Sequence, residues 1–230
     1  MTILLTGGSG LLGTELQKHI ECYAPSHDEF DIDREFDIDT IRDLGVNVDL
    51  IVHCAAYTDV VKAEEERNKC YRTNVLGTKY VAMIGVPMVY ISTEYVFGGG
   101  KGNYMPNDPP DPINFYALTK LLGEGMCSYA PSTLIIRTLF KPRPFEHPHA
   151  CTDQWTSGDY IDVISSMIVD AIKEWDRISN EIIHIGTGRK STYELAKQSR
   201  PDVKPCLRSD IKSVKLPMDT SLAQEWREFW

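Results

Sequence analysis

The sequence predicts an α/β fold of the Rossmann type, a doubly wound parallel sheet with a small C-terminal portion. Short apolar segments alternate with stretches of helical periodicity, as expected where crossover helices join parallel strands. A glycine-rich turn follows the first apolar segment. The 230 residues, 42% of them hydrophobic, suffice to bury a substantial core. These three observations together favour a single α/β unit over an all-α or all-β fold.

The first strand is expected over residues 2–6, and the first helix over residues 11–20. Between them, glycines at positions 7, 10 and 13 allow a tight turn, close approach of a pyrophosphate, and close helix-on-strand packing. Free N–H groups at the helix start can bind phosphate. Strand, glycines and helix in this order predict a dinucleotide site. Its candidate residues are Gly7, Ser9, Gly10, Leu11, Leu12 and Gly13.

The later elements are expected to continue the alternation. Further strands are expected over residues 20–23, 48–54, 87–92, 132–137 and 181–185. Further helices are expected over residues 39–44, 62–83 (one helix or two), 114–129 and 160–175. Residues 141–148 are proline-rich and should form a loop, and the stretch from Pro201 has little to build a core. We therefore expect a dinucleotide-binding domain over 1–140 and a reduced substrate-binding region over 141–230, interleaved with the first.

A tyrosine and a lysine, Tyr116 and Lys120, lie four residues apart on the helix expected over 114–129. This spacing places both side chains on one face of the helix. An ammonium near a phenol favours the phenolate, so the pKa of Tyr116 should fall below its ordinary value of about 10. A tyrosine whose pKa is lowered toward neutral pH can act as a general acid. With the glycine turn, the pair predicts a hydride-transfer site.

Composition and charge exclude several classes of function. A formal net charge of -9 without a basic patch argues against a nucleic-acid partner. No apolar stretch is long enough for a signal peptide or a membrane span, so we expect a cytoplasmic protein without a membrane partner. The six cysteines form no Cys-x-x-Cys pair and are expected to be reduced. His147 and His149 lie in the proline-rich loop without companion ligands, so no metal site is expected.

These motifs resemble the extended short-chain dehydrogenases/reductases, and more narrowly the dTDP-4-dehydrorhamnose reductase family. Residues 6–13, 55–58, 92–97 and 114–124 match that family in order and spacing, with weaker similarity at 137–138, 153–154 and 219–222. The similarity covers nearly the whole chain. The resemblance implies an NAD(P)-dependent oxidoreductase of deoxysugar nucleotide biosynthesis. Its reaction would be reduction of the 4-keto group of a nucleotide-linked 4-keto-6-deoxysugar.

The resemblance also implies roles for individual residues. Tyr116 would protonate the ketone oxygen, Lys120 would lower the pKa of Tyr116 and bind the nicotinamide ribose, and Thr93 would hydrogen-bond the ketone or Tyr116. The implied substrate contacts are Thr93, Glu94, Tyr95 and Thr138. Beyond the glycine turn, the implied cofactor contacts are Ser26, His27, Asp31, Ile32, Ala55, Ala56, Tyr57, Asn74 and Ser92, with Tyr116 and Lys120. The cofactor is NADP(H) or NAD(H), because Ser26 and His27 slightly favour NADP whereas Asp28 argues against it.

Two positions separate this chain from its relatives. Sugar-nucleotide 4,6-dehydratases carry two carboxylates after the threonine, and GDP-fucose synthases carry a cysteine at the second of these places, where this chain has Tyr95. Tyr95 therefore favours a simple reductase, although such reductases usually carry aspartate in place of Glu94. The chain is also shorter than typical members after Phe140, so the nucleotide of the substrate stays open.

Three further questions stay open at this point. One alternative is a bifunctional 3,5-epimerase/4-reductase of a UDP- or GDP-sugar. Another is a non-catalytic, nucleotide-binding regulatory relative such as the regulatory subunit of methionine adenosyltransferase. The assembly is also undecided, with a homodimer as the candidate.

Overall fold

A five-stranded parallel sheet forms the centre of the computed structural model, which describes residues 1–34 and 47–224. Every pairing within this sheet is parallel, so the carboxyl ends of the strands meet at one edge. The expected α/β class and parallel sheet are confirmed. The strand order is β1 (Ile3–Thr6), β2 (Leu50–His53), β3 (Met88–Thr93), β4 (Thr133–Thr138) and β9 (Ile182–His184).

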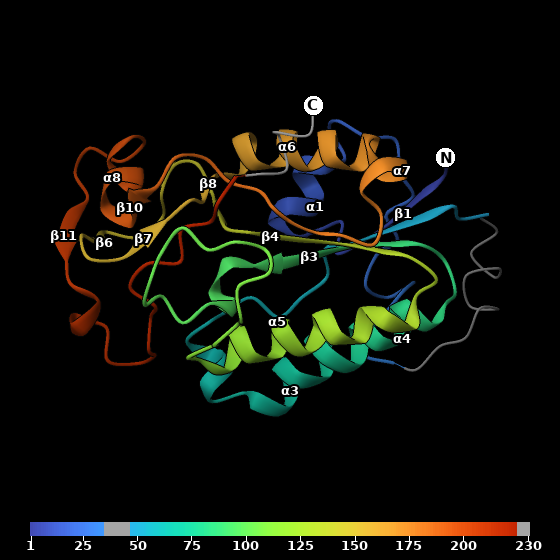
Figure 1. Ribbon diagram of the computed structural model, residues 1–230, viewed down its shortest axis with the longest axis horizontal. Helices are drawn as coiled ribbons and strands as arrows, with labels where there is room; N and C mark the ends of the chain where they lie inside the picture. The colour runs from blue at the N-terminus through green and yellow to red at the C-terminus, as the bar shows by residue number, and fades with distance from the viewer. Residues whose placement is uncertain (35–46, 225–230) are drawn as a thin grey trace.

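Helices cover both faces of the sheet (Figure 1). One face carries α1 (Leu11–Leu16) and α6 (Ile161–Lys173), and the other carries α3 (Arg67–Tyr71), α4 (Thr78–Met83) and α5 (Phe115–Met126). Successive strand residues point to opposite faces, so β2 sends Leu50 and Val52 into one core and Ile51 into the other. Both faces are buried, which is why the strands are continuous apolar runs rather than alternating ones.

The strand expected over 20–23 is reduced to one bridge, so that prediction is wrong. Tyr23 alone lies beside β1, where its N–H donates to Ile3 O and its carbonyl accepts from Leu5 N, both at 2.8 Å. Pro25 follows two residues later and has no N–H to extend the ladder. The first helix is also shorter than expected and ends at Leu16. The helix expected over 39–44 lies outside the described residues.

The helical stretch expected over 62–83 consists of four consecutive pieces. These are η1 (Lys62–Glu64), α3, a π-helical segment η2 (Arg72–Gly77), and α4. A π-turn widens the helix locally and is often found at functional sites. Here the widened turn carries Asn74, whose backbone carbonyl accepts a hydrogen bond from Thr78 Oγ1 at 2.8 Å.

Residues after 140 contribute both to the central sheet and to a cluster of short elements at one end of it (Figure 1). The helix and strand expected over 160–175 and 181–185 are present as α6 and β9. The cluster consists of three two-stranded sheets together with α8 (Thr192–Lys197). The pairs are β5 (Phe140–Lys141) with β8 (Asp159–Tyr160), β6 (His149–Cys151) with β11 (Lys204–Cys206), and β7 (Trp155–Thr156) with β10 (Lys190–Ser191).

Short helical turns complete the fold. They are η3 (Glu94–Val96), η4 (Cys127–Tyr129), α7 (Trp175–Ile178) and η5 (Arg208–Asp210). The polar C-terminal stretch is anchored by Leu222, which packs in a small buried cluster with Val96, Phe97 and Tyr104. Within the described ranges, no helix is long and apolar enough to cross a membrane.

Candidate functional site

A cleft of about 620 Å³ opens at the carboxyl edge of the sheet, within the size range of small-molecule and cofactor sites. It is lined by the turns that follow β1, β2, β3 and β4, which is where ligands bind in doubly wound folds. Most of the predicted site residues meet there. They are Gly7, Ser9, Gly10, Leu11, Leu12, Gly13, His27, Ile32, Ala55, Ala56, Tyr57, Ser92, Thr93, Tyr95, Tyr116, Lys120 and Thr138.

The glycine turn forms a cradle that side chains would fill. Gly7 adopts a φ of +70°, and a Cβ atom on it would lie 2.6 Å from the Ala55 nitrogen. A Cβ atom on Gly13 would lie 2.2 Å from the Gly7 carbonyl oxygen, far inside contact distance. Glycine at these positions therefore lets the turn pack against the loop after β2 and against its own backbone, and it leaves the turn without side chains at residues 7 and 13. The cradle fits the pyrophosphate of a nicotinamide dinucleotide, which Gly7, Ser9 and the turn backbone would hold.

The start of α5 positions Tyr116 and Lys120. Asn114 caps the helix, because its Oδ1 accepts a hydrogen bond from Ala117 N at 2.9 Å. One turn further on, the Lys120 ammonium lies over the Tyr90 ring, 4.1 Å from its centroid. Tyr116 and Lys120 both reach the cleft at the end of β3, beside Thr93.

The protonation of this pair differs from the sequence expectation. Burial raises the pKa of Tyr116 to about 12, and the hydroxyl of Thr93 only partly opposes this rise. Burial also lowers the pKa of Lys120 to about 8. The expected fall in the pKa of Tyr116 is therefore wrong, because burial of the phenolate outweighs the hydrogen bond from Thr93. Tyr116 is protonated at neutral pH, the state that a proton donor needs.

Four predicted site residues do not line the cleft: Ser26, Asp31, Asn74 and Glu94. Ser26 instead donates from both N and Oγ to Glu29 Oε2, each at 2.8 Å. The Asp31 carboxylate pairs with His27 Nε2 at 3.4 Å and with Arg34 Nε at 3.1 Å. Asp31 thereby holds the imidazole of His27, which does line the cleft.

Asn74 is buried behind the loop that follows β2. Its Oδ1 accepts from Tyr57 N at 2.8 Å, and its Nδ2 donates to Tyr57 O at 3.1 Å and Thr119 Oγ1 at 3.0 Å. These bonds tie the Tyr57 backbone to α5 through Thr119. In this structure Asn74 thus fixes the wall of the cleft.

Glu94 points away from the cleft toward the C-terminal segment. It is fully buried, and its Oε1 accepts a hydrogen bond from Thr220 Oγ1 at 2.6 Å. Burial raises the pKa of this carboxyl group to about 7. The sequence could not show this orientation, because Thr220 lies 126 residues away.

Several cleft residues were missed by the sequence reasoning. The main group is the segment that follows β4, comprising Leu139, Phe140, Lys141, Pro142, Phe145, Glu146 and His147. Its first members come directly after the end of β4, at the same edge of the sheet as Ser92 and Thr93 at the end of β3, and this was the available signal. The proline-rich composition predicted only a surface loop, so the sequence did not indicate that His147 lines the cleft.

A buried polar network locks α5 against the sheet. Arg137 on β4 donates from Nε to Glu124 Oε1 at 3.0 Å and from Nη2 to Glu124 Oε2 at 2.8 Å. Ser92 Oγ donates to the same Glu124 Oε1 at 2.5 Å. Since Glu124 lies one helical turn beyond Lys120, this network fixes the rotation of α5 and the position of its cleft-facing residues.

The fold and the cleft define an α/β protein of the Rossmann type. Residues 1–140 match the RmlD substrate binding domain family. The chain belongs to this family, and the resemblance drawn from its motifs is confirmed.

Two curated relatives illustrate the family. A dTDP-4-dehydrorhamnose reductase from Mycolicibacterium smegmatis is 33% identical over 148 residues, which cover 59% of this chain and 44% of that protein. Methionine adenosyltransferase 2 subunit beta from Rattus norvegicus is 34% identical over 139 residues, covering 53% of this chain and 41% of that protein. The chain spans about half the length of the curated relatives it matches.

Solved structures resemble the whole chain. A dTDP-4-dehydrorhamnose reductase from Bacillus anthracis in complex with NADP superposes with a TM-score of 0.85 at 26% identity, covering 99% of this chain and 92% of the other. A dTDP-glucose 4,6-dehydratase from Streptomyces venezuelae with NAD bound shares the fold, with a TM-score of 0.78 at 19% identity, covering 100% of this chain and 90% of the other. Structural relatives thus include both NADP and NAD complexes.

Proposed function

We propose that this chain reduces the 4-keto group of a nucleotide-linked 4-keto-6-deoxysugar with NAD(P)H. The observation that carries the proposal is the convergence of Tyr116, Lys120 and Thr93 in one cleft with the glycine cradle. A proton donor and a dinucleotide cradle are the two parts that carbonyl reduction requires. The names of the reductase relatives support the choice of a 4-keto sugar as substrate.

The residues divide the work of the reaction. A reduced nicotinamide held by the glycine cradle would supply the hydride that the carbonyl carbon accepts as the C=O π-bond breaks. Tyr116 donates its phenolic proton to the carbonyl oxygen, so the product is a secondary alcohol. Thr93, beside the phenol, orients this donor. The Lys120 ammonium favours the tyrosinate left after proton transfer and lies where it can hold the nicotinamide ribose.

The far end of the cleft would receive the sugar. Tyr95 and Thr138 line it, and Tyr95 Oη is held in place by a hydrogen bond from Gln154 Nε2 at 2.8 Å. His27 also lines the cleft, and we propose that it contacts the ribose of the adenosine. An imidazole N–H can donate a hydrogen bond to a 2′-phosphate, so we propose NADP(H) as the preferred cofactor, with NAD(H) as the alternative.

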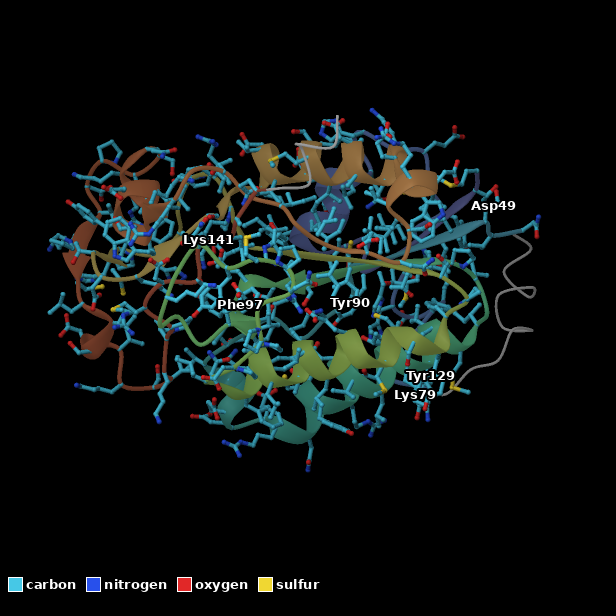
Figure 2. All side chains as sticks on the ribbon, in the orientation of Figure 1. Asp49, Lys79, Tyr90, Phe97, Tyr129 and Lys141 are labelled. Atoms are coloured by element: carbon cyan, nitrogen blue, oxygen red, sulfur yellow. The ribbon has the colours of Figure 1, made fainter. Side chains whose placement is uncertain are left out.

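The test is oxidation of NADPH and NADH with a panel of 4-keto-6-deoxy sugar nucleotides, for the wild type and Tyr116→Phe. We expect a loss of about 100-fold or more in kcat, the range assigned to a general acid, with cofactor binding retained. Tyr129→Phe is the matched control, because Tyr129 is exposed at the distal end of η4 (Figure 2). Undiminished turnover by Tyr116→Phe would contradict the mechanism.

A second candidate function is regulation of a partner enzyme through nucleotide binding. The observation that favours it is the 34% identity to methionine adenosyltransferase 2 subunit beta over 139 residues. The same assay separates the two candidates. Cofactor binding without turnover of any keto sugar would support the regulatory function.

A further inference from the structure

Lys141 places a second unpaired cation in the cleft. Among the lysines that line the cleft, Lys69 pairs with Glu66 at 3.6 Å. Lys120 and Lys141 make no ion pair or hydrogen bond through their ammonium groups to any residue in 1–34 or 47–224. Lys120 is assigned to the reaction. The role of Lys141 is unassigned, and residue 141 carries no part of the family motifs.

The backbone of Lys141 is fixed by secondary structure. It belongs to β5, which pairs with β8 in the register Lys141 to Tyr160. Tyr160 is fully buried and donates from Oη to Leu195 O at 2.8 Å. The strand pair therefore fixes the backbone from which the Lys141 side chain extends into the cleft.

Lys141 is remote from the glycine cradle. The cradle follows β1 and Lys141 follows β4, and these strands are separated by three strand spacings, or roughly 14 Å across the sheet. Figure 2 shows Lys141 near the end of the sheet where β8 begins, far from Asp49 at the opposite end. Lys141 thus lies away from the glycine cradle, on the side of the cleft formed after β3 and β4 with Tyr95 and Thr138.

The surroundings of Lys141 favour an anionic ligand. Burial lowers the pKa of its ammonium, whereas Glu94 and Glu146 act to raise it. Glu94 is directed to Thr220, and Glu146 is exposed at the rim, so neither carboxylate pairs with Lys141. A partly desolvated ammonium without a partner binds an anionic oxygen more favourably than a neutral one.

We propose that Lys141 binds an anionic oxygen of the substrate, a phosphate or carboxylate oxygen, at the end of the cleft opposite the glycine cradle. This inference rests on the proposed function for the class of substrate. Lys141 then supplies a charged substrate contact in place of Glu94, which the family resemblance implied as a contact but which does not line the cleft. The residue that carries substrate selectivity then lies after β4 rather than after β3.

Calorimetric titration of Lys141→Met, Lys141→Arg and wild type tests the proposal. The probes are dTDP, UDP and GDP, their glucose conjugates, and UDP-glucuronic acid, with NADPH titrated separately. We expect Lys141→Met to bind at least one class of probe about tenfold or more weakly, as for loss of a charged hydrogen bond. Lys141→Arg should retain most of the affinity, and NADPH binding should be unchanged. Lys173→Met, at an exposed position on α6, is the matched control.

The pattern across probes identifies the anion. Equal losses for the free nucleoside diphosphates and their conjugates assign the contact to phosphate, whereas a loss confined to UDP-glucuronic acid assigns it to a carboxylate. Unchanged affinity of Lys141→Met for every probe, a loss confined to NADPH, or no binding of any probe by the wild type would overturn the inference. Titration needs no turnover, so weakened binding without NAD(P)H oxidation would refute the reductase function alone.

Discussion

Replacing Arg137 with methionine removes the cation of the buried network that holds α5 against the sheet. The side chains of Arg137 and Glu124 are only 4% and 6% exposed, and two hydrogen bonds join them. Methionine keeps most of the volume of the arginine side chain but leaves the Glu124 carboxylate buried without its charged partner, with only the hydrogen bond from Ser92 remaining. The perturbation is therefore chiefly electrostatic rather than a loss of packing.

The expected cost in free energy of unfolding is about 3–5 kcal/mol, the range for breaking one partner of a buried ion pair. An exposed pair gives the contrast. Lys18 and Glu15 also approach to 2.7 Å, but the lysine side chain is 59% exposed, and such pairs contribute about 0–1 kcal/mol. Arg137→Met should thus cost several times more than Lys18→Met, although the nitrogen–oxygen distances are similar.

The assay is urea denaturation of wild type, Arg137→Met, Lys18→Met and the double variant Arg137→Met/Glu124→Leu. The double variant replaces both charges by apolar groups, so about half or more of the lost stability should return. Glu124→Gln provides an intermediate step, because it retains hydrogen-bonding capacity and loses the charge. It also keeps the comparison measurable if Arg137→Met does not fold.

Two results would refute the reasoning. A loss of less than about 1 kcal/mol in the free energy of unfolding of Arg137→Met would show that the Arg137–Glu124 pair contributes no more than an exposed ion pair. A double variant that is less stable than Arg137→Met would show that the network stabilises the fold through its hydrogen bonds rather than costing a desolvation penalty.

Two further predictions concern the glycines of α5 and the buried carboxyl group of Glu94. Gly123→Ala should destabilise the fold by more than about 1 kcal/mol, because the new Cβ would lie 2.3 Å from Tyr90 Oη. A Cβ on Gly125 meets nothing within 4 Å, so Gly125→Ala should stabilise the fold by about 0.5–1 kcal/mol. Thermal unfolding of the two variants and the wild type measures the difference. Glu94 has its pKa raised to about 7 when folded, so its protonated form is favoured and stability should fall as pH rises from about 4.5 to 7, by about 3 kcal/mol. Glu94→Gln should flatten that part of the stability–pH curve in urea titrations, and an unchanged slope would contradict the assignment.

Local patterns sufficed for the fold and for much of the site. The glycine turn requires a strand before it and a helix after it, and the structure has both around Gly7 and Gly13. The four-residue spacing of Tyr116 and Lys120 placed both on α5 at the cleft. The prediction of a strand over 20–23 was wrong because Pro25 has no N–H to continue the pairing with β1, and this outweighed the apolar composition of the segment.

The sequence by itself determined the chemical groups available, because the glycine spacing, the Tyr116–Lys120 pair and the parallel-sheet pattern all depend on neighbours within one or two elements. Tertiary structure alone decided the protonation of Tyr116, the direction of Glu94 and the presence of Lys141 in the cleft. Burial depends on residues that are distant in the chain, as in the contact of Glu94 with Thr220, and burial sets both the pKa values and the surfaces that face a ligand.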